Sequence, residues 1–369
     1  MLRSSVSRAV RAAGGVQQRV ARQHARCASS VGTADLDWGS MLFDYVPTNA
    51  HVEYTWRDGE WDAGVVKRKP TVEVSIFSNA FHYGQACFEG LKVFALADGS
   101  VAAYQPYQGN HERMSNGAAR LGMPAPSGET FNTAIERCVL ENLEFVPPYG
   151  SDGAMYVRPV LFGCGNQLGL GPAPEYKFIV AVSPVGNYYA GGLQAIPGMV
   201  MTKYDRAAGR GIGGVKAGGN YAADVVPSAE AKAAGFPIAL YLDAKSQTMV
   251  EEFSTSNFIA IDKSGNYVTP KSPSILPSVT NKSLRQIALD LGMGVEEREV
   301  PWSEVSEFEE VAACGTAVVL TPIQSLTKGN EVVKFSGFTK FQTMYDRIRG
   351  IQLGHIEDKH SWMATLFKP

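Results

Sequence analysis

The sequence predicts an α+β protein built from two domains. Strand-like and helix-like segments follow one another irregularly, without the regular strand–helix alternation of a parallel α/β sheet. The chain has 369 residues, enough for two domains. A glycine-rich stretch, 186–192, suits a connection between them. We therefore expect a small N-terminal domain over residues 35–186, an interdomain loop over 187–200 and a large domain over 201–369.

The first 34 residues differ in composition from the rest of the chain. They contain six arginines, no lysine and no acidic residue, with alanine, serine and valine at most other positions. This composition is typical of an organellar transit peptide, and it lacks the continuous apolar core of a secretory signal. Because the basic residues are all arginines, we expect a mitochondrial (matrix) rather than a plastid destination. The alternative is a basic tail that binds nucleic acid.

The rest of the chain argues against several classes of protein. Without residues 1–34, 28 basic residues face 36 acidic ones, so the net charge is −8 and we expect no nucleic-acid partner. No apolar run approaches the ~18 residues of a membrane span, so we expect no membrane partner. The remaining cysteines form no C-x-x-C pair and the histidines show no metal-binding spacing, so we expect no metal. These absences leave an organic cofactor as the expected source of chemistry.

The first half of the chain is expected to begin with short β segments and to continue into helices. Two apolar segments flank the turn Asp98-Gly99 and predict a hairpin. The predicted strands are Thr71–Ile76, Gly90–Ala95, Val101–Tyr104, Met155–Leu161 and Phe178–Ser183, and the predicted helices are 108–123 and 129–145.

The second half is predicted to mix strands and helices in the same irregular way. The predicted strands are 238–242, 257–261 and 317–320, and the predicted helices are 222–234, 280–291 and 338–351.

Lys216 is the strongest candidate for chemistry, because five glycines surround it between Gly211 and Tyr221. A lysine in a backbone-rich, poorly solvated pocket can lose its proton near neutral pH and attack an aldehyde. Further along, the acidic pair Glu251-Glu252 precedes an apolar run. Pyridoxal phosphate (PLP) requires both such a lysine and an acid facing its ring nitrogen.

Two other interpretations of the glycine-rich run are available. It could be an ordinary flexible loop. It could also be a dinucleotide-binding fingerprint, but that motif needs a preceding strand, and residues 202–210 are polar and not strand-like.

A phosphate group would need backbone N–H groups, hydroxyls and an arginine. Leu276–Ser283 closes a loop and opens a predicted helix, whose first N–H groups favour an anion. Cys314–Ala317 predicts a tight turn with a hydroxyl, and Arg113 lies on a predicted helix. Each feature alone is common in proteins.

Taken in order, these segments resemble the branched-chain amino acid aminotransferases, a fold-type IV PLP family. The motifs are Phe88–Lys92, Tyr156–Pro159, Gly214–Tyr221, Glu252 with Asn257-Phe258, Leu276-Pro277 with Val279-Thr280, and Gly315–Ala317. The opening Asp37-Trp38, Phe43 and Val46–Thr48 resemble the plant and bacterial branch, and the resemblance extends to about Trp362. It implies a transaminase that moves the amino group between L-leucine, L-isoleucine or L-valine and 2-oxoglutarate through a PLP Schiff base.

The resemblance also implies residue roles. Lys216 matches the Schiff-base lysine and proton carrier, Tyr221 the partner of the cofactor's phenolic oxygen, and Glu252 the partner of its ring nitrogen, with Glu251 a spectator. The implied phosphate ligands are Arg113, the backbone of Val279 and Thr280, and Thr316. The implied substrate residues are Phe43, Tyr83, Phe88, Tyr156 and Arg158, with Thr316 and Ala317 for the α-carboxylate.

Family members of this kind are homodimers with shared active sites, so we expect a homodimer in which the loop Phe43–Thr48 reaches the partner's pocket. The alternative is that this loop covers its own core. Animal relatives carry a redox C-x-x-C after the Gly-Thr-Ala turn, whereas Val318–Thr321 follows here, so we expect no such thiol regulation.

Two competing assignments remain open. Another fold-type IV enzyme, a D-amino acid aminotransferase or an aminodeoxychorismate lyase, is the nearer one. A catalytically silent PLP-binding protein is the other, and the presence of both Lys216 and Glu252 argues against it.

Overall fold

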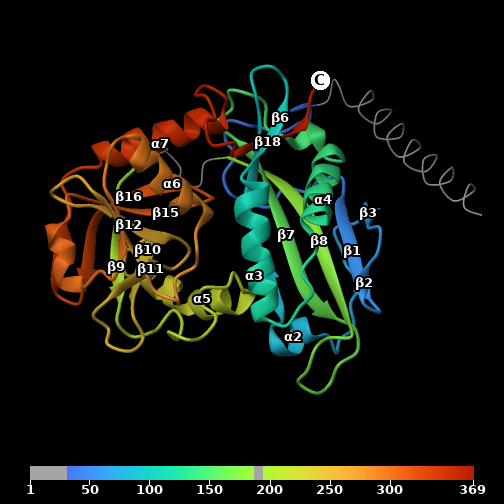
Figure 1. Cartoon of the computed structure of the whole chain (residues 1–369), viewed down its shortest axis with the longest axis horizontal. Coiled ribbons are helices and arrows are strands. Elements are labelled where there is room, and N and C mark those ends of the chain that lie inside the picture. The colour runs from blue at the N-terminus through green and yellow to red at the C-terminus, as the bar shows by residue number, and fades with distance from the viewer. Residues whose placement is uncertain (1–30, 187–193) are drawn as a thin grey trace, which may run out of the picture.

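The computed structural model describes residues 31–186 and 194–369. Over these residues the chain forms two nine-stranded sheets with helices packed against each, which confirms the α+β class (Figure 1). Residues 1–30 of the expected transit peptide and 187–193 of the expected interdomain loop lie outside the described part.

The first sheet has the strand order β18-β6-β5-β7-β8-β1-β2, with β3 paired to β1 and β4 to β7. The expected hairpin is confirmed, since β5 and β6 pair antiparallel and Gly99 turns with a φ of 80°. The strands are β1 His51–Arg57, β2 Glu60–Trp61, β3 Val65–Lys67, β4 Ala86–Phe88, β5 Leu91–Ala95, β6 Val101–Tyr104, β7 Ala154–Cys164, β8 Glu175–Val185 and β18 Met363–Phe367.

The second sheet has the order β11-β10-β9-β16-β15-β12-β13-β14, with β17 paired to β16. A further pairing between β11 and β12 closes six of these strands into a barrel. The strands are β9 Ile196–Met201, β10 Ile238–Leu242, β11 Val250–Phe253, β12 Asn257–Ile261, β13 Tyr267–Pro270, β14 Val295–Arg298, β15 Glu310–Gly315, β16 Val319–Lys328 and β17 Glu331–Lys334.

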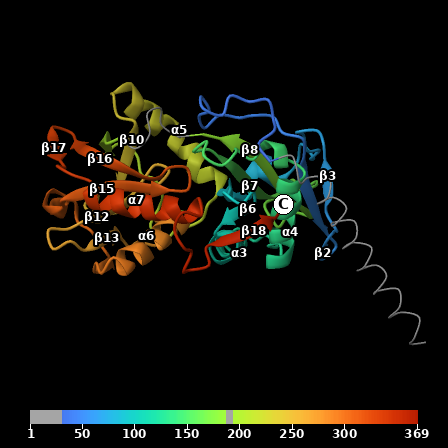
Figure 2. The same cartoon turned by 90° about the horizontal axis from the view of Figure 1, so that it is seen from above.

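Helices cover the outer surfaces of both sheets, and α5 lies between the two halves (Figures 1 and 2). The helices are α2 Asn79–Tyr83, α3 Glu112–Arg120, α4 Gly128–Leu140, α5 Gly218–Ala233, α6 Val279–Asp290 and α7 Thr339–Gln352. Shorter helical segments are Pro106–His111, Leu143–Phe145 and Trp302–Glu307.

Helices α3 and α4 lie beside β7 and β8, whereas α6 and α7 pack on the second sheet (Figure 1). Burial alternates along β7 and β8, as expected for strands whose two faces differ in solvent contact. Phe131 and Ile135 of α4 join Phe178 and Val180 of β8 in the first core. A second core lies under α6 and α7, where Phe94 and Tyr104 of the first sheet pack with residues of the second sheet, so the two halves are in direct contact.

Several expected elements need correction. Thr71–Ile76 is not a strand, because β3 ends at Lys67 and Pro70 has no N–H to continue the pairing. The expected helix 108–123 divides into a π-helical turn and α3, and the expected helix 129–145 ends as an α-helix at Leu140. The strand expected at 317–320 begins at Val319 and continues to Lys328.

The C-terminal strand β18 returns to the first sheet and pairs antiparallel with β6. The end of the chain therefore packs with its N-terminal half. Among the helices of the described residues, none is long and apolar enough to cross a membrane.

Candidate active site

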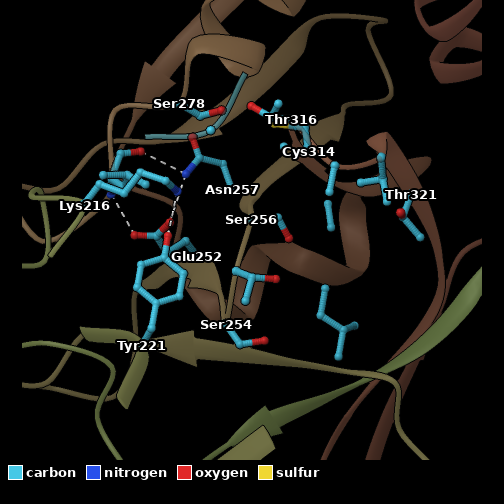
Figure 3. Close-up of a pocket in the computed structure, with 18 of the residues that line it drawn as sticks. Lys216, Tyr221, Glu252, Ser254, Ser256, Asn257, Ser278, Cys314, Thr316 and Thr321 are labelled. Atoms are coloured by element: carbon cyan, nitrogen blue, oxygen red, sulfur yellow. Dashed lines mark hydrogen bonds between the residues drawn. The ribbon is translucent and has the colours of Figure 1, made fainter. Parts of the chain in front are cut away.

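A cavity of about 250 Å³ opens between the two halves. Strands β4 and β7 supply one side, while β11, the end of β15 and the segment around the start of α5 supply the other. The structure brings together ten of the predicted site residues: Phe43, Phe88, Arg113, Tyr156, Arg158, Lys216, Tyr221, Glu252, Thr316 and Ala317. Figure 3 shows Lys216, Tyr221 and Glu252 close together, with Thr316 on a turn across the pocket.

The loop before α5 places Lys216 in this cavity. The Asn220 side chain donates to the carbonyls of Ile212 (2.9 Å) and Val215 (2.8 Å), which closes the loop on itself. The backbone N–H of Phe88 donates to the Lys216 carbonyl at 3.0 Å, which joins the loop to β4. A side chain at Gly213 would clash with the Ser274 carbonyl. The glycines thus allow close backbone packing, which does not support the flexible-loop interpretation.

The Lys216 amine lies in an aromatic setting. Its Nζ donates to Tyr221 Oη at 2.8 Å and lies 4.9 Å from the centroid of the Phe88 ring. Burial, assisted by the positive charge of Arg113, lowers the pKa of Lys216 to about 7. Much of the amine is therefore unprotonated at neutral pH, as a nucleophile or general base must be.

Glu252 lies on β11 and is 2% exposed. Its Oε1 accepts from the Leu276 N–H at 2.7 Å, and its Oε2 accepts from Asn257 Nδ2 at 3.0 Å. Arg206 forms a buried ion pair with the same carboxylate at 2.9 Å. Burial raises the pKa of Glu252 to about 7, although Arg206 opposes this shift. With its pKa near 7, this carboxylate can hold or release a proton at neutral pH.

Glu251 faces away from the cavity, as strand alternation requires. Its carboxylate accepts hydrogen bonds from Ser272 and Ser274. Of the two acids the structure places Glu252 at the cavity, and the sequence gave no indication of Arg206. That arginine stands 46 positions before Glu252, in a segment without a recognisable motif.

Arg113 lines the cavity while engaging Glu89 with two of its nitrogens. Its Nε donates to Glu89 Oε1 at 2.8 Å and its Nη2 to Glu89 Oε2 at 2.6 Å, and Nη1 donates to the Pro277 carbonyl at 3.0 Å. Glu89 is fully buried and also accepts from Asn110 at 2.7 Å. The guanidinium is thereby oriented and its charge is partly balanced, which the sequence did not reveal.

The start of α6 borders the cavity through Ser278, its N-cap residue, whose Oγ accepts from the Asn281 N–H at 3.2 Å. The structure does not bring Val279 or Thr280 into the lining of this cavity. Val279 lines a neighbouring cavity of about 440 Å³, and the Thr280 side chain is buried. The lining hydroxyls that sequence reasoning missed are Ser254, Thr255, Ser256, Ser278 and Thr321.

These residues fit PLP. A buried carboxylate, a partly neutral lysine and a tyrosine lie together, while hydroxyls, Arg113 and a helix N-terminus supply donors for a phosphate. Among the described residues, no cluster of three His, Cys, Asp or Glu side chains is arranged to hold a metal ion.

Aromatic side chains form the other part of the cavity. Phe43 packs edge-on against Tyr156 with ring centroids 5.0 Å apart. The Arg158 guanidinium lies 4.7 Å from the Phe88 ring centroid, and its Nη2 donates to Tyr156 Oη at 3.3 Å. The wall is therefore apolar, with one cation held over its rings.

Two of the expected substrate residues are placed differently from the expectation. Tyr83 lies at the end of α2, 41% exposed, with its hydroxyl donating to the Leu168 carbonyl, so it does not line this cavity. Phe43, expected at the start of a loop that reaches a partner, lines the pocket of its own chain, and the contact of the rest of Phe43–Thr48 with a partner stays a prediction. Tyr45, in the same loop, is exposed.

Gly90 sets the position of Tyr156. A Cβ at this position would clash with Tyr156 Oη and come within 2.7 Å of its Cζ. We expect Gly90→Ala to displace the Tyr156 ring and to raise the KM for a branched-chain amino acid about tenfold or more in steady-state assays. Gly337→Ala is the matched control, since a Cβ there meets nothing within 4 Å. An unchanged KM in Gly90→Ala would show that Tyr156 does not shape the substrate pocket.

Comparison with known proteins agrees with this site. The family described as class IV amino-transferases matches residues 86–326. A branched-chain-amino-acid aminotransferase of Haemophilus influenzae is 42% identical over 342 residues, covering 90% of this chain and 99% of that one. Branched-chain amino acid aminotransferase 1, mitochondrial, of Humulus lupulus is 36% identical over 345 residues, covering 92% of this chain and 87% of that one.

Solved structures show the same fold. The branched-chain amino acid aminotransferase of Escherichia coli superposes with a TM-score of 0.69 at 25% identity, covering 85% of this chain and 99% of that one. That of Thermobaculum terrenum, described in its PLP form, gives 0.72 at 19% identity, covering 87% and 99%. The chain therefore belongs to the class IV aminotransferases, within the group of the branched-chain-amino-acid aminotransferases.

Proposed function

We propose that the protein transfers the amino group between L-leucine, L-isoleucine or L-valine and 2-oxoglutarate, with PLP as cofactor. The observation that carries this proposal is the cavity in which Lys216, with a pKa lowered to about 7, lies beside Tyr221 and the buried Glu252. The similarity to the branched-chain aminotransferases supports the substrate class.

In this proposal each residue has a defined task. PLP, when bound, withdraws electrons from the substrate Cα into its protonated ring. Glu252 would keep the ring nitrogen protonated, and Tyr221 Oη would be available to the phenolic oxygen. Lys216 Nζ would be the amine that holds the cofactor covalently and, once released by the substrate, the base that takes up the proton of the substrate Cα. Thr316 and Arg113 would hold the phosphate at the cavity, and the backbone of Val279 and Thr280, which lie outside the cavity lining at the start of α6, would add N–H donors.

The two substrate types share one pocket. Phe43, Phe88 and Tyr156 provide an apolar wall for a branched aliphatic side chain, while the turn at Thr316 and Ala317 receives the α-carboxylate. Glutamate and 2-oxoglutarate carry a second carboxylate, which requires a cation within an otherwise apolar pocket. Arg158, held over the rings of Phe88 and Tyr156, supplies it.

Steady-state turnover with a panel of amino acids and 2-oxo acids tests the proposal. We expect L-leucine, L-isoleucine and L-valine to react with 2-oxoglutarate, and D-alanine not to react. Turnover of D-alanine alone would instead indicate a D-amino acid aminotransferase. Bound PLP without turnover of any substrate would indicate a binding protein.

We also propose that the protein is a homodimer. Around α2 the structure exposes an apolar surface, here called the α2 patch, formed by Ile76, Phe77, Phe81, Tyr83, Leu168 and Leu170. The two segments are joined by hydrogen bonds from the Gln167 N–H to the Phe77 carbonyl and from Tyr83 to the Leu168 carbonyl. A contiguous patch of this kind on a soluble chain indicates an interface, and a C₂ dimer would bury it in both subunits.

Charges introduced into the α2 patch test the dimer. We expect wild-type protein to show twice the chain mass by light scattering, and the pair Phe81→Glu and Leu170→Glu to shift it toward the monomer. Val332→Glu, on β17 and also exposed, is the control. A wild-type monomer with full activity would contradict the proposal.

We propose that residues 1–34 direct the protein to mitochondria. Their six arginines and lack of acids support this, while the relatives include proteins named as mitochondrial and as chloroplastic. A reporter fused to residues 1–34 should accumulate in mitochondria, and replacement of the six arginines by glutamine should leave it in the cytosol. Plastid or nuclear accumulation of the intact fusion would refute the mitochondrial address.

We propose the domain division 35–186 and 201–369, joined by 187–200, with the correction that β9, Ile196–Met201, already belongs to the second sheet. The two sheets support this division. The exception is β18, whose residues fall within 201–369 but which pairs in the sheet of the first domain.

A further inference from the structure

Lys92 is a buried lysine that has no role in the proposed reaction. It lies on β5 and is 8% exposed, and its Nζ donates to the Ala317 carbonyl at 2.7 Å. Within the described residues, no carboxylate forms an ion pair with it. Burial, assisted by nearby Arg349, lowers the pKa of Lys92 to about 7. A buried amine without a carboxylate partner lowers the stability of a fold. Its presence therefore suggests a role other than stabilising the core.

The residue that Lys92 contacts lies in the turn between β15 and β16. Gly315 pairs with Val319 at the base of this turn, and residues 316–318 line the active-site cavity. Val319 has a φ of 66°, a left-handed conformation that is strained for a β-branched side chain. Such a conformation persists only when the surroundings hold the backbone in place. Lys92 provides one such contact, from the other sheet.

Because the peptide unit is planar, the hydrogen bond to the Ala317 carbonyl also fixes the direction of the Val318 N–H at the cavity. In a trans peptide the carbonyl of residue 317 and the N–H of residue 318 point in opposite directions. Because the Ala317 carbonyl is directed at Lys92, which does not line the cavity, the Val318 N–H points away from Lys92. The hydrogen bond that the carbonyl accepts from Lys92 also polarises the same amide and strengthens its N–H as a donor.

We propose that Lys92 is a positioning residue that orients and polarises the Ala317–Val318 peptide for recognition of the substrate α-carboxylate. This inference rests on the proposed function, because it assumes that the turn receives a carboxylate. Lys92 itself does not touch the substrate. Its role is specific for the carboxylate and independent of the aliphatic side chain, which contacts the aromatic wall.

Lys92→Met, which removes the amine and keeps the length and apolar stem, tests this inference in the PLP-loaded protein. We expect the KM for L-leucine and for its 2-oxo acid to rise about tenfold, with kcat changed far less. Binding of 4-methylvaleric acid, which carries the carboxylate without an amino group, should weaken by a similar factor. Binding of 3-methylbutan-1-amine, which lacks the carboxylate, should not change.

Two further variants separate the hydrogen bond from charge and stability. Arg349→Met removes the neighbouring cation, which does not contact the turn, and should leave the binding of 4-methylvaleric acid unchanged. Lys92→Gln replaces Lys92→Met if the latter lowers the melting temperature. Equal loss of affinity for the acid and the amine, or no loss for either, would overturn the inference. Because the acid and the amine bind without turnover, their affinities can be measured even if L-leucine proves not to be a substrate.

Discussion

Replacing Lys216 by alanine is expected to reduce transamination by about 10⁴-fold or more, because one amine both attaches the cofactor and carries the proton. The structure gives this amine the required protonation state, since burial and Arg113 lower its pKa to about 7. Initial rates with L-leucine and 2-oxoglutarate measure the effect. Covalently retained PLP, assayed after denaturation following borohydride reduction, should disappear in parallel.

Lys203→Ala is the matched control for this experiment. Lys203 belongs to the segment preceding the same loop, but it is exposed and pairs with Glu230 at 2.8 Å. Its removal should leave both turnover and covalent retention unchanged. A Lys216→Ala protein with normal turnover would refute the assignment of the catalytic lysine.

Glu252→Gln is expected to slow proton transfer at the substrate Cα by about 10²-fold or more, because glutamine cannot hold a proton on the ring nitrogen. Leu276 N–H and Arg206 would still have an amide oxygen to donate to, so we expect PLP to remain bound. Single-turnover spectroscopy with L-leucine isolates this half-reaction from the second substrate.

Glu251→Gln provides an internal comparison at the adjacent position. Both acids are buried, yet the Glu251 carboxylate accepts hydrogen bonds from Ser272 and Ser274 behind the strand. Its replacement should leave the single-turnover rate near that of the wild type. If the two variants were equally slow, the effect would reflect damage to β11, and if Glu252→Gln were unaffected, another acid would face the ring.

The sequence predicted those parts of the site that depend on local patterns. The glycine-rich run marked Lys216 and Tyr221, and the placement of these residues five positions apart at the start of α5 brings their polar atoms to 2.8 Å. The resemblance to the aminotransferase family, and no local pattern, separated Glu252 from Glu251. The strands at 238–242 and 257–261 and the helices at 280–291 and 338–351 were confirmed to within a residue or two, because their apolar patterns are strong.

What the sequence did not predict depends on contacts between distant segments. The ion pairs of Glu89 with Arg113 and of Arg206 with Glu252 join segments that share no local signal. Strand β9 contains Pro197 and Gly198, both unfavourable in strands, and forms because it is paired on both sides by β10 and β16. The position of Tyr83 on an exposed helix likewise follows from the packing of α2, which composition does not encode.

The return of β18 to the first sheet has a consequence for how the protein is made. While the ribosome is still producing the second half, β6 has no neighbour on one side, because its partner consists of the last residues of the chain. Such an open edge can pair with other chains and lead to aggregation. A premature stop before Met363 would leave that edge open permanently, although every residue that lines the catalytic cavity would have been translated.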